Sequence, residues 1–129
     1  MRTFQPGTRV IALSSSTTSK SSYSAYTLAK EIQVLQGGII NTSFELRTGR
    51  DDERVYGKIY VNGIAVGTER SNKNDNWVIF NEDIPIQAGD KVQLYVKGGN
   101  TGFLSWTVDV RNFKIMIGNT VPGATVLVG

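Results

Sequence analysis

Residues 55–69, VYGKIYVNGIAVGTE, contain two short segments of alternating apolar and polar residues on either side of Asn62-Gly63. A two-residue hairpin loop that follows the twist of its strands needs a positive φ at both loop positions, and Asn-Gly adopts such values at least cost. The same pattern returns in residues 82–97, EDIPIQAGDKVQLYVK, where Ala88-Gly89-Asp90 separates two alternating runs. The chain is therefore predicted to be built from β-hairpins.

Period-two alternation of this kind places one face of a strand in the core and the other in water. In residues 40–47, even positions are predicted to point inward and odd positions outward. One segment is ambiguous, because residues 23–35, YSAYTLAKEIQVL, would also suit a helix ended by Gly37-Gly38. A strand is favoured there, since Tyr26, Leu28, Ile32 and Val34 share one parity, with Lys30 interrupting it. The predicted inward positions elsewhere are Val55, Ile59, Val61, Ile64, Val66, Val78, Phe80, Ile84, Val92, Leu94, Val96, Leu104, Trp106, Val108, Val110, Phe113 and Ile115. A shift of parity predicts a β-bulge near Arg111-Asn112.

These elements predict an all-β fold of eight or nine strands, an antiparallel two-sheet β-sandwich that is most simply a jelly roll. The predicted organisation has three parts. Residues 1–24 form an apolar N-terminal segment plus a Ser/Thr-rich tract, 14–24, that is a loop or a folded hairpin edge. Residues 25–118 form the sandwich core. Residues 119–129 end in ATVLVG, which is a last strand of the sandwich or an arm that pairs with a neighbouring subunit.

The amino-acid composition excludes several kinds of catalytic site. The chain has 129 residues, no Cys and no His, which excludes thiol nucleophiles, disulfides, His-based triads and imidazole acid–base catalysis. It contains no apolar run of about 18 residues, so no membrane partner is predicted. The net charge is +3, but the basic residues are scattered rather than clustered. Nucleic acid is therefore not an expected partner either.

The acidic residues do not form a recognisable catalytic or metal site. Asp51, Asp52 and Glu53 offer oxygen ligands for Ca²⁺, but Arg50 and Arg54 bracket them and the spacing is not that of a calcium loop. A solvated charged loop is favoured. The acids available for carboxylate-based hydrolysis lie at polar positions or strand ends, and no pair stands out among Glu45, Glu82, Asp83 and Asp109. We expect no enzymatic activity, no catalytic residue, no metal and no cofactor.

Aromatic residues offer the clearest candidate for binding. Tyr56 and Tyr60 share the outer parity of one strand, and Trp77 opens another. The three rings are predicted to form a glycan platform, or else to serve as cross-strand packing or a subunit interface, which is the common use of aromatic residues in sheets.

Several pieces of the chain, in order, resemble small β-sandwich modules in structural proteins of tailed bacteriophages. These pieces are YTLAKEIQV (26–34), SFEL (43–46), KIYVNGIAVGTER (58–70), FNEDIPIQAGDKVQLYVK (80–97) and VRNFKI (110–115). Together they span most of residues 26–117. The pattern consists of turns and core positions and contains no catalytic residue. The resemblance implies a virion component made in the host cytoplasm.

Two functions follow as expectations. The first is a capsid decoration, or cement, protein that binds the major capsid protein or other virion proteins and stabilises the head, with a homotrimer favoured. Its expected contact residues lie near the two ends of the chain: Phe4, Val10, Ile11, Val121, Val126, Leu127 and Val128. The alternative is a tail, baseplate or fibre-associated module that binds carbohydrate on the host surface through Tyr56, Tyr60 and Trp77.

Overall fold

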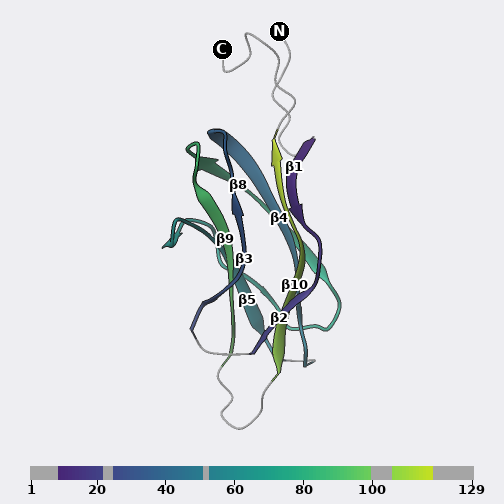
Figure 1. Ribbon diagram of the computed structural model, residues 1–129. Helices are drawn as coiled ribbons and strands as arrows, with labels where there is room; N and C mark the ends of the chain where they lie inside the picture. The colour runs from purple at the N-terminus through teal and green to yellow at the C-terminus, as the bar shows by residue number, and fades with distance from the viewer. Residues whose placement is uncertain (1–8, 22–24, 51–52, 100–105, 118–129) are drawn as a thin grey trace.

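The computed structural model describes residues 9–21, 25–50, 53–99 and 106–117. Within these ranges the chain forms ten β-strands and no helix, arranged as two antiparallel sheets that pack face to face (Figure 1). The predicted all-β sandwich is confirmed, with ten strands where eight or nine were expected. The same ranges contain no helix long and apolar enough to cross a membrane.

Sheet A contains β1 (Arg9–Ser14), β10 (Thr107–Ile117), β4 (Gly38–Thr48) and β8 (Val78–Ile86) in that order, with β2 (Thr18–Ser21) also paired to β10. Because β1 and β2 pair with successive parts of β10, residues 9–21 belong to this sheet rather than lying apart from it. For the Ser/Thr-rich tract, the hairpin-edge alternative therefore holds over Thr18–Ser21.

Sheet B contains β3 (Thr27–Gln33), β9 (Lys91–Gly98) and β5 (Val55–Val61) in that order. Two short strands, β6 (Ile64–Ala65) and β7 (Arg70–Asn72), pair with successive parts of β5 at its free edge. The strand predicted in residues 23–35 is confirmed by β3, and the helical alternative is wrong. In Figure 1, β3 and β9 stand on the left and β1 and β10 on the right, so the two sheets are seen edge-on.

The Asn62-Gly63 turn has the predicted geometry, with φ of 51° at Asn62 and 82° at Gly63. The Asn62 side chain accepts a hydrogen bond from the backbone N–H of Lys91 (3.0 Å) and donates one to Oδ1 of Asp90 (3.0 Å). The backbone N–H of Gly63 donates to Oε1 of Gln93 (2.8 Å). The hairpin is thus fastened to the turn before β9, and two hairpins distant in sequence are held in register.

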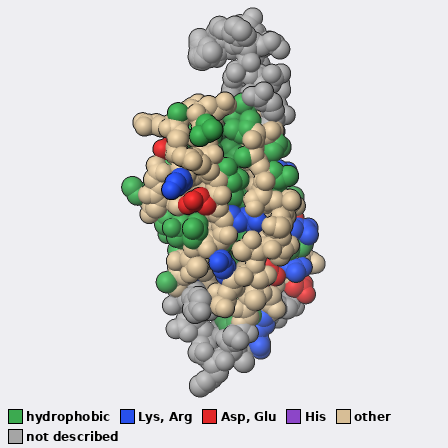
Figure 2. All heavy atoms as spheres, in the orientation of Figure 1, with side chains coloured by type: hydrophobic (Ala, Val, Ile, Leu, Met, Phe, Trp, Pro, Cys, Tyr) green, Lys and Arg blue, Asp and Glu red, His purple; other side chains and the backbone are tan. Residues whose placement is uncertain are grey.

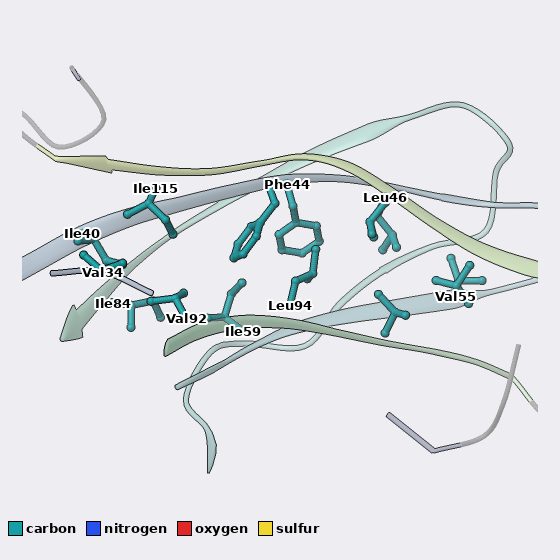
Figure 3. Close-up of a cluster of buried hydrophobic side chains, with 14 of the residues drawn as sticks. Val34, Ile40, Phe44, Leu46, Val55, Ile59, Ile84, Val92, Leu94 and Ile115 are labelled. Carbon is teal, nitrogen blue, oxygen red and sulfur yellow. The ribbon is translucent and has the colours of Figure 1, made fainter. Parts of the chain in front are cut away.

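The core lies between the sheets and follows the predicted alternation (Figure 3). Phe44 lies in the middle of the core. Its ring packs against the backbone of β5 at Gly57, where an added Cβ would come within 3.0 Å of the ring. The buried apolar side chains are Val34, Ile40, Phe44, Leu46, Val55, Ile59, Ile84, Ile86, Val92, Leu94, Val96, Trp106, Val108, Val110, Phe113 and Ile115.

Ile64 and Val66 were predicted to face the core but do not lie in it, and the predicted inward residue Leu104 lies outside the described residues. Ile64 and Val66, beyond the tight turn, are 68% and 47% exposed, because β6 ends after two residues. They line an open groove of about 570 Å³ together with Val61 and Pro85 at the edge where β6 approaches β8. The alternation continues in the sequence there, but both side chains remain largely exposed.

Register shifts mark β-bulges or irregularities in three strands, and one of them lies in β1 between Val10 and Ala12. The predicted bulge in β10 is confirmed by a register shift between Arg111 and Lys114 and by a φ of 53° at Asn112. Another register shift lies between Leu28 and Lys30 in β3. The single parity expected for that strand is therefore wrong. Leu28, before the shift, is exposed on the outer side of the sheet, whereas Lys30, after it, is buried on the inner side.

Lys30 is held at the seam between the two sheets. Its Nζ donates a hydrogen bond to Oγ of Ser14 in β1 (2.8 Å), and burial lowers the pKa of its ammonium group. On the opposite edge, the carboxylate of Glu82 in β8 accepts hydrogen bonds from Thr68 and forms an ion pair with Arg70 (3.7 Å). Polar contacts thus join the two sheets at both edges.

Candidate binding site

The outer face of sheet B gathers most of the tyrosines of the chain. Alternate residues of β5 and β9 point to this face, and the register places Tyr56 opposite Lys97, Lys58 opposite Tyr95 and Tyr60 opposite Gln93. Tyr26, just before β3, joins them by ring contact with Tyr60. We call this surface the tyrosine face; it comprises Tyr26, Tyr56, Lys58, Tyr60, Gln93, Tyr95 and Lys97.

The rings of the tyrosine face contact one another in a fixed arrangement. Tyr60 and Tyr95 are stacked, with ring centroids 4.0 Å apart and an interplanar angle of 24°. Tyr26 leans on Tyr60 at 6.0 Å and 55°. Such offset and tilted pairs add to stability beyond their buried area. The face therefore presents an ordered aromatic surface rather than independent side chains.

Two lysines lie among these rings. Nζ of Lys97 is 4.9 Å from the Tyr26 ring centroid and 5.1 Å from that of Tyr56, and Nζ of Lys58 is 5.7 Å from Tyr26. Both distances for Lys97 fall within the range of a cation–π contact. Glu69 lies beside Lys97, with 3.7 Å between Oε2 and Nζ.

Tyr26 is fixed by the same carboxylate. Its hydroxyl donates a hydrogen bond of 2.5 Å to Oε2 of Glu69. Burial, followed by this hydrogen bond and the charge of Glu69, raises the pKa of Tyr26 far above its ordinary value. The phenol therefore stays protonated and acts as a hydrogen-bond donor rather than as a base.

The end of the tyrosine face away from Lys97 carries Gln93 and, two residues earlier in β9, Lys91. Nε2 of Gln93 donates to Oε1 of Glu31 (2.7 Å), while its Oε1 accepts from the Gly63 backbone. Gln93 is thereby held in one orientation next to Tyr60. We call Lys58, Lys97 and Arg54 the cationic end. Arg54 is included because it donates to Oγ of Ser71, which lies opposite Tyr56 in the sheet. Gln93 and Glu31 form the amide end.

Trp77 does not join this surface. It lies on the outer side of sheet A, where the guanidinium carbons of Arg47 and Arg111 are 4.4 Å and 4.2 Å from its ring centroid. The expected platform of three rings is therefore wrong in its geometry. It was expected because strand alternation shows which side of a strand faces outward but not which sheet the strand enters. The structure brings Tyr56 and Tyr60 onto one face and places Trp77 on the opposite side of the sandwich.

The candidate catalytic carboxylates are each engaged separately. Asp109 pairs with Arg47 (3.0 Å), Glu45 with Arg111 (2.9 Å), and Asp83 accepts from Asn41 (2.9 Å). Burial would raise the pKa of Glu45, but hydrogen bonds from Asn112 and Arg111 outweigh it and hold this pKa below its ordinary value. A carboxylic acid with a lowered pKa is a poor proton donor near neutral pH.

No metal site forms among the described residues, in which no group of three or more acidic side chains gathers. Of the acidic loop considered for Ca²⁺, Asp51 and Asp52 lie outside the described ranges. Arg54, which follows this loop, donates a hydrogen bond to Oγ of Ser71 (2.8 Å).

The expected contact residues for a capsid partner are described only in β1. Val10 is 48% exposed on this edge strand, and Ile11 is partly buried against the core. Leu13, which was not predicted as a contact, is 54% exposed on the same strand. Figure 2 shows hydrophobic side chains gathered between the two sheets in this edge-on view. Phe4, Val121, Val126, Leu127 and Val128 lie outside the described residues.

Tyr26, Tyr95 and Lys97 were missed as site residues by sequence reasoning. For Tyr95 and Lys97 the signal was present, because they alternate with the inward-facing Leu94 and Val96 in β9. For Tyr26 the signal was misleading, since the bulge in β3 reverses the parity that grouped it with Val34.

No protein family model matches the chain, and no curated protein matches it. Among solved structures, the chain is similar to the CBM22-1 xylan-binding domain of Paenibacillus barcinonensis Xyn10C, with a TM-score of 0.55 and 10% identity over 91% of this chain and 99% of that one. It also matches the C-terminal CBM6 of LamC, a marine laminarinase from Zobellia galactanivorans, with a TM-score of 0.46 and 11% identity over 83% and 92%. A chain of infectious bursal disease virus strain Gx matches with a TM-score of 0.48 and 15% identity over 88% of this chain and 33% of that one. At these identities the first likeness shows the β-sandwich fold alone, and the other two carry no further argument.

Proposed function

We propose that the protein is a non-enzymatic binding module whose tyrosine face holds a carbohydrate. In line with the resemblance to phage structural modules, we place it in a virion, where it would contact polysaccharide on the host surface. One observation carries this proposal: Tyr26, Tyr60 and Tyr95 form a contiguous aromatic surface on the outside of sheet B, with hydrogen-bonding groups at both ends.

The chemistry of the surface suits a sugar. Aromatic rings offer apolar area that complements the C–H face of a pyranose, while fixed polar groups beside them set its orientation. Tyr26 is such a group, because its hydroxyl is held by the hydrogen bond that it donates to Glu69, whereas Gln93 is buried and both ends of its amide are bound within the protein. A surface that is already ordered loses little conformational freedom when a ligand binds.

The proposal is tested by a glycan array followed by titration calorimetry. We expect Tyr95→Ala to weaken binding about ten-fold, since removal of a central aromatic contact costs about 1.4 kcal/mol or more. Trp77→Ala, on the opposite sheet, is the matched aromatic control and should leave binding unchanged. Equal binding by both variants, or no glycan bound by the wild type, would overturn the proposal.

A second candidate is supported by a different region. Strand β1 is an edge of sheet A and exposes Val10 and Leu13, and an unpaired edge with apolar side chains is suited to pairing with another chain. We keep capsid decoration as this candidate, with the major capsid protein as partner and a homotrimer as the expected assembly.

Particles titrated with the protein separate the two candidates. A Val10→Ser, Leu13→Ser double variant should lose capsid binding if decoration is the function and retain glycan binding if the tyrosine face is used. Unchanged capsid binding by this variant would remove the argument from β1.

A further inference from the structure

The two lysines of the tyrosine face differ in how their charges are balanced. Lys97 lies 3.7 Å from the Glu69 carboxylate, which also accepts the hydrogen bond from Tyr26. Lys58 contacts the Tyr26 ring but forms no ion pair with any carboxylate in the described part of the chain. Arg54, at the same end, donates to a neutral hydroxyl, that of Ser71. Of these three cations, Lys97 alone forms an ion pair with a carboxylate among the described residues.

The cations that lie over an aromatic ring on the outer face of sheet A are balanced in a different way. There, the arginines that lie over Trp77 are both paired, Arg47 with Asp109 at 3.0 Å and Arg111 with Glu45 at 2.9 Å. A cation held beside an aromatic surface without its own anion has room for an anion supplied by a ligand.

We infer that the tyrosine face takes acidic carbohydrate, a polysaccharide with carboxylates on its sugar rings, and that Lys58 pairs with these carboxylates. This inference rests on the proposed carbohydrate-binding function and names the class of ligand. Stacking on Tyr60 and Tyr95 would place one sugar ring over the middle of the face. A carboxylate on that sugar, or on the next one, then lies toward the cationic end.

Charges of both signs lie at the amide end, because Glu31 accepts from Gln93 at 2.7 Å and Lys91 lies two residues before Gln93 in β9. At the cationic end, Lys58 forms no ion pair within the described residues. An acidic unit is therefore expected over Lys58, with either a neutral or an acidic unit toward Gln93.

The experiment compares one polysaccharide in two charge states. Oligogalacturonate and its fully methyl-esterified form share a backbone and differ in the carboxylate, and hyaluronate oligosaccharides supply a case in which acidic and neutral sugars alternate. Titration calorimetry at 50 mM and 1 M NaCl would be run with wild type, Lys58→Gln, Lys58→Arg and Lys114→Gln. The last removes one charge from the outer face of sheet A and is the matched control.

We expect acidic ligands to bind the wild type at least about three-fold more tightly than the ester at 50 mM NaCl, and the difference to shrink at 1 M, where the screening length falls to about 3 Å. Lys58→Gln should remove most of the preference, while Lys58→Arg and Lys114→Gln should keep it. Circular dichroism melting confirms that each variant is folded.

The outcomes separate this inference from the function on which it rests. Equal binding of acid and ester, lost in Tyr95→Ala, would overturn the preference for acidic sugars and leave carbohydrate binding standing. No binding of either form, together with no hit on the glycan array, would overturn both. A preference that Lys58→Gln does not alter would show that other cations recognise the acid, and would also contradict the inference.

Discussion

On the outer face of sheet A, both arginines that lie over Trp77 are bound to carboxylates, whereas on the outer face of sheet B Lys58 has no such partner among the described residues. Both faces combine aromatic rings with cations, and both rest on the same core. We interpret the two arginines over Trp77 as stabilising the fold, and we propose that Lys58 leaves capacity for a ligand.

The largest effect is expected from the core that both faces share. Phe44→Ala should lower the free energy of unfolding by about 3–5 kcal/mol, because it removes a buried ring and leaves a cavity against Gly57. Urea unfolding measures the loss. Ile79→Ser, at a position of β8 that is 60% exposed, is the control and should change stability by less than about 0.5 kcal/mol. Similar values for the two variants would mean that the ring does not organise the core.

The next effect concerns the paired charges of sheet A. Glu45→Gln should cost about 1–2 kcal/mol, since Arg111 and Asn112 lose a charged acceptor in a partly buried place. Glycan binding should not change, because this residue lies on the opposite sheet. Loss of binding without loss of stability would reverse the roles assigned to the two faces.

The same carboxylate predicts a pH dependence. Because the folded-state pKa of Glu45 is lowered, its contribution is fully present above its unfolded value of 4.5 and is lost as the pH falls through the folded pKa. The stability difference between wild type and Glu45→Gln should therefore be constant from pH 5 to 7 and decrease below about pH 4.5. A difference that grows on acidification would contradict the pairing seen in the structure.

A smaller effect is expected from the rings of sheet B. A double-mutant cycle of Tyr60→Ala and Tyr95→Ala should give a coupling of about 0.5–1.5 kcal/mol in unfolding free energy, as measured for aromatic pairs in contact. Tyr56 and Tyr95 make no ring contact that the structure records and provide the reference cycle, whose coupling should be smaller. Equal coupling in the two cycles would mean that the stacked pair is not formed in solution.

The smallest effect is expected for Lys58→Gln, with a change in stability of less than about 0.5 kcal/mol in thermal unfolding, since no ion pair is lost. The loss of stability should thus be smaller for Lys58→Gln than for Glu45→Gln. The Glu45 charge on sheet A would then stabilise the fold, and the Lys58 charge on sheet B would not. A loss above 1 kcal/mol would instead make Lys58 part of the scaffold.

Turns and inward-facing positions could be predicted because they depend on local chemistry. The positive φ values at Asn62 and Gly63, the burial of Phe44 and the bulge near Asn112 all follow from neighbouring residues. The location of Trp77 could not be predicted in this way. Alternation tells inner from outer positions of a strand, but it does not tell which of two sheets the strand enters.

The bulge in β3 limited the prediction for a different reason. A single extra residue between Leu28 and Lys30 exchanges the two sides of the strand, and the amino-acid types give no strong local sign of it. The only hint was Lys30 itself, a charged residue among apolar ones, which turned out to be buried and bound to Ser14. Tyr26 was therefore expected inside, and the tyrosine face was predicted with half of its rings.

The hydrogen bonds around Asn62 also bear on how the protein ages. An Asn followed by Gly is the dipeptide most prone to deamidation, in which the backbone nitrogen of the Gly attacks the side-chain carbonyl carbon of the Asn. Here that nitrogen donates to Gln93, and both ends of the Asn62 amide are bound, one to Lys91 and the other to Asp90. Folding thus protects the dipeptide from deamidation. The rate of deamidation is then set by how often these three hydrogen bonds break together.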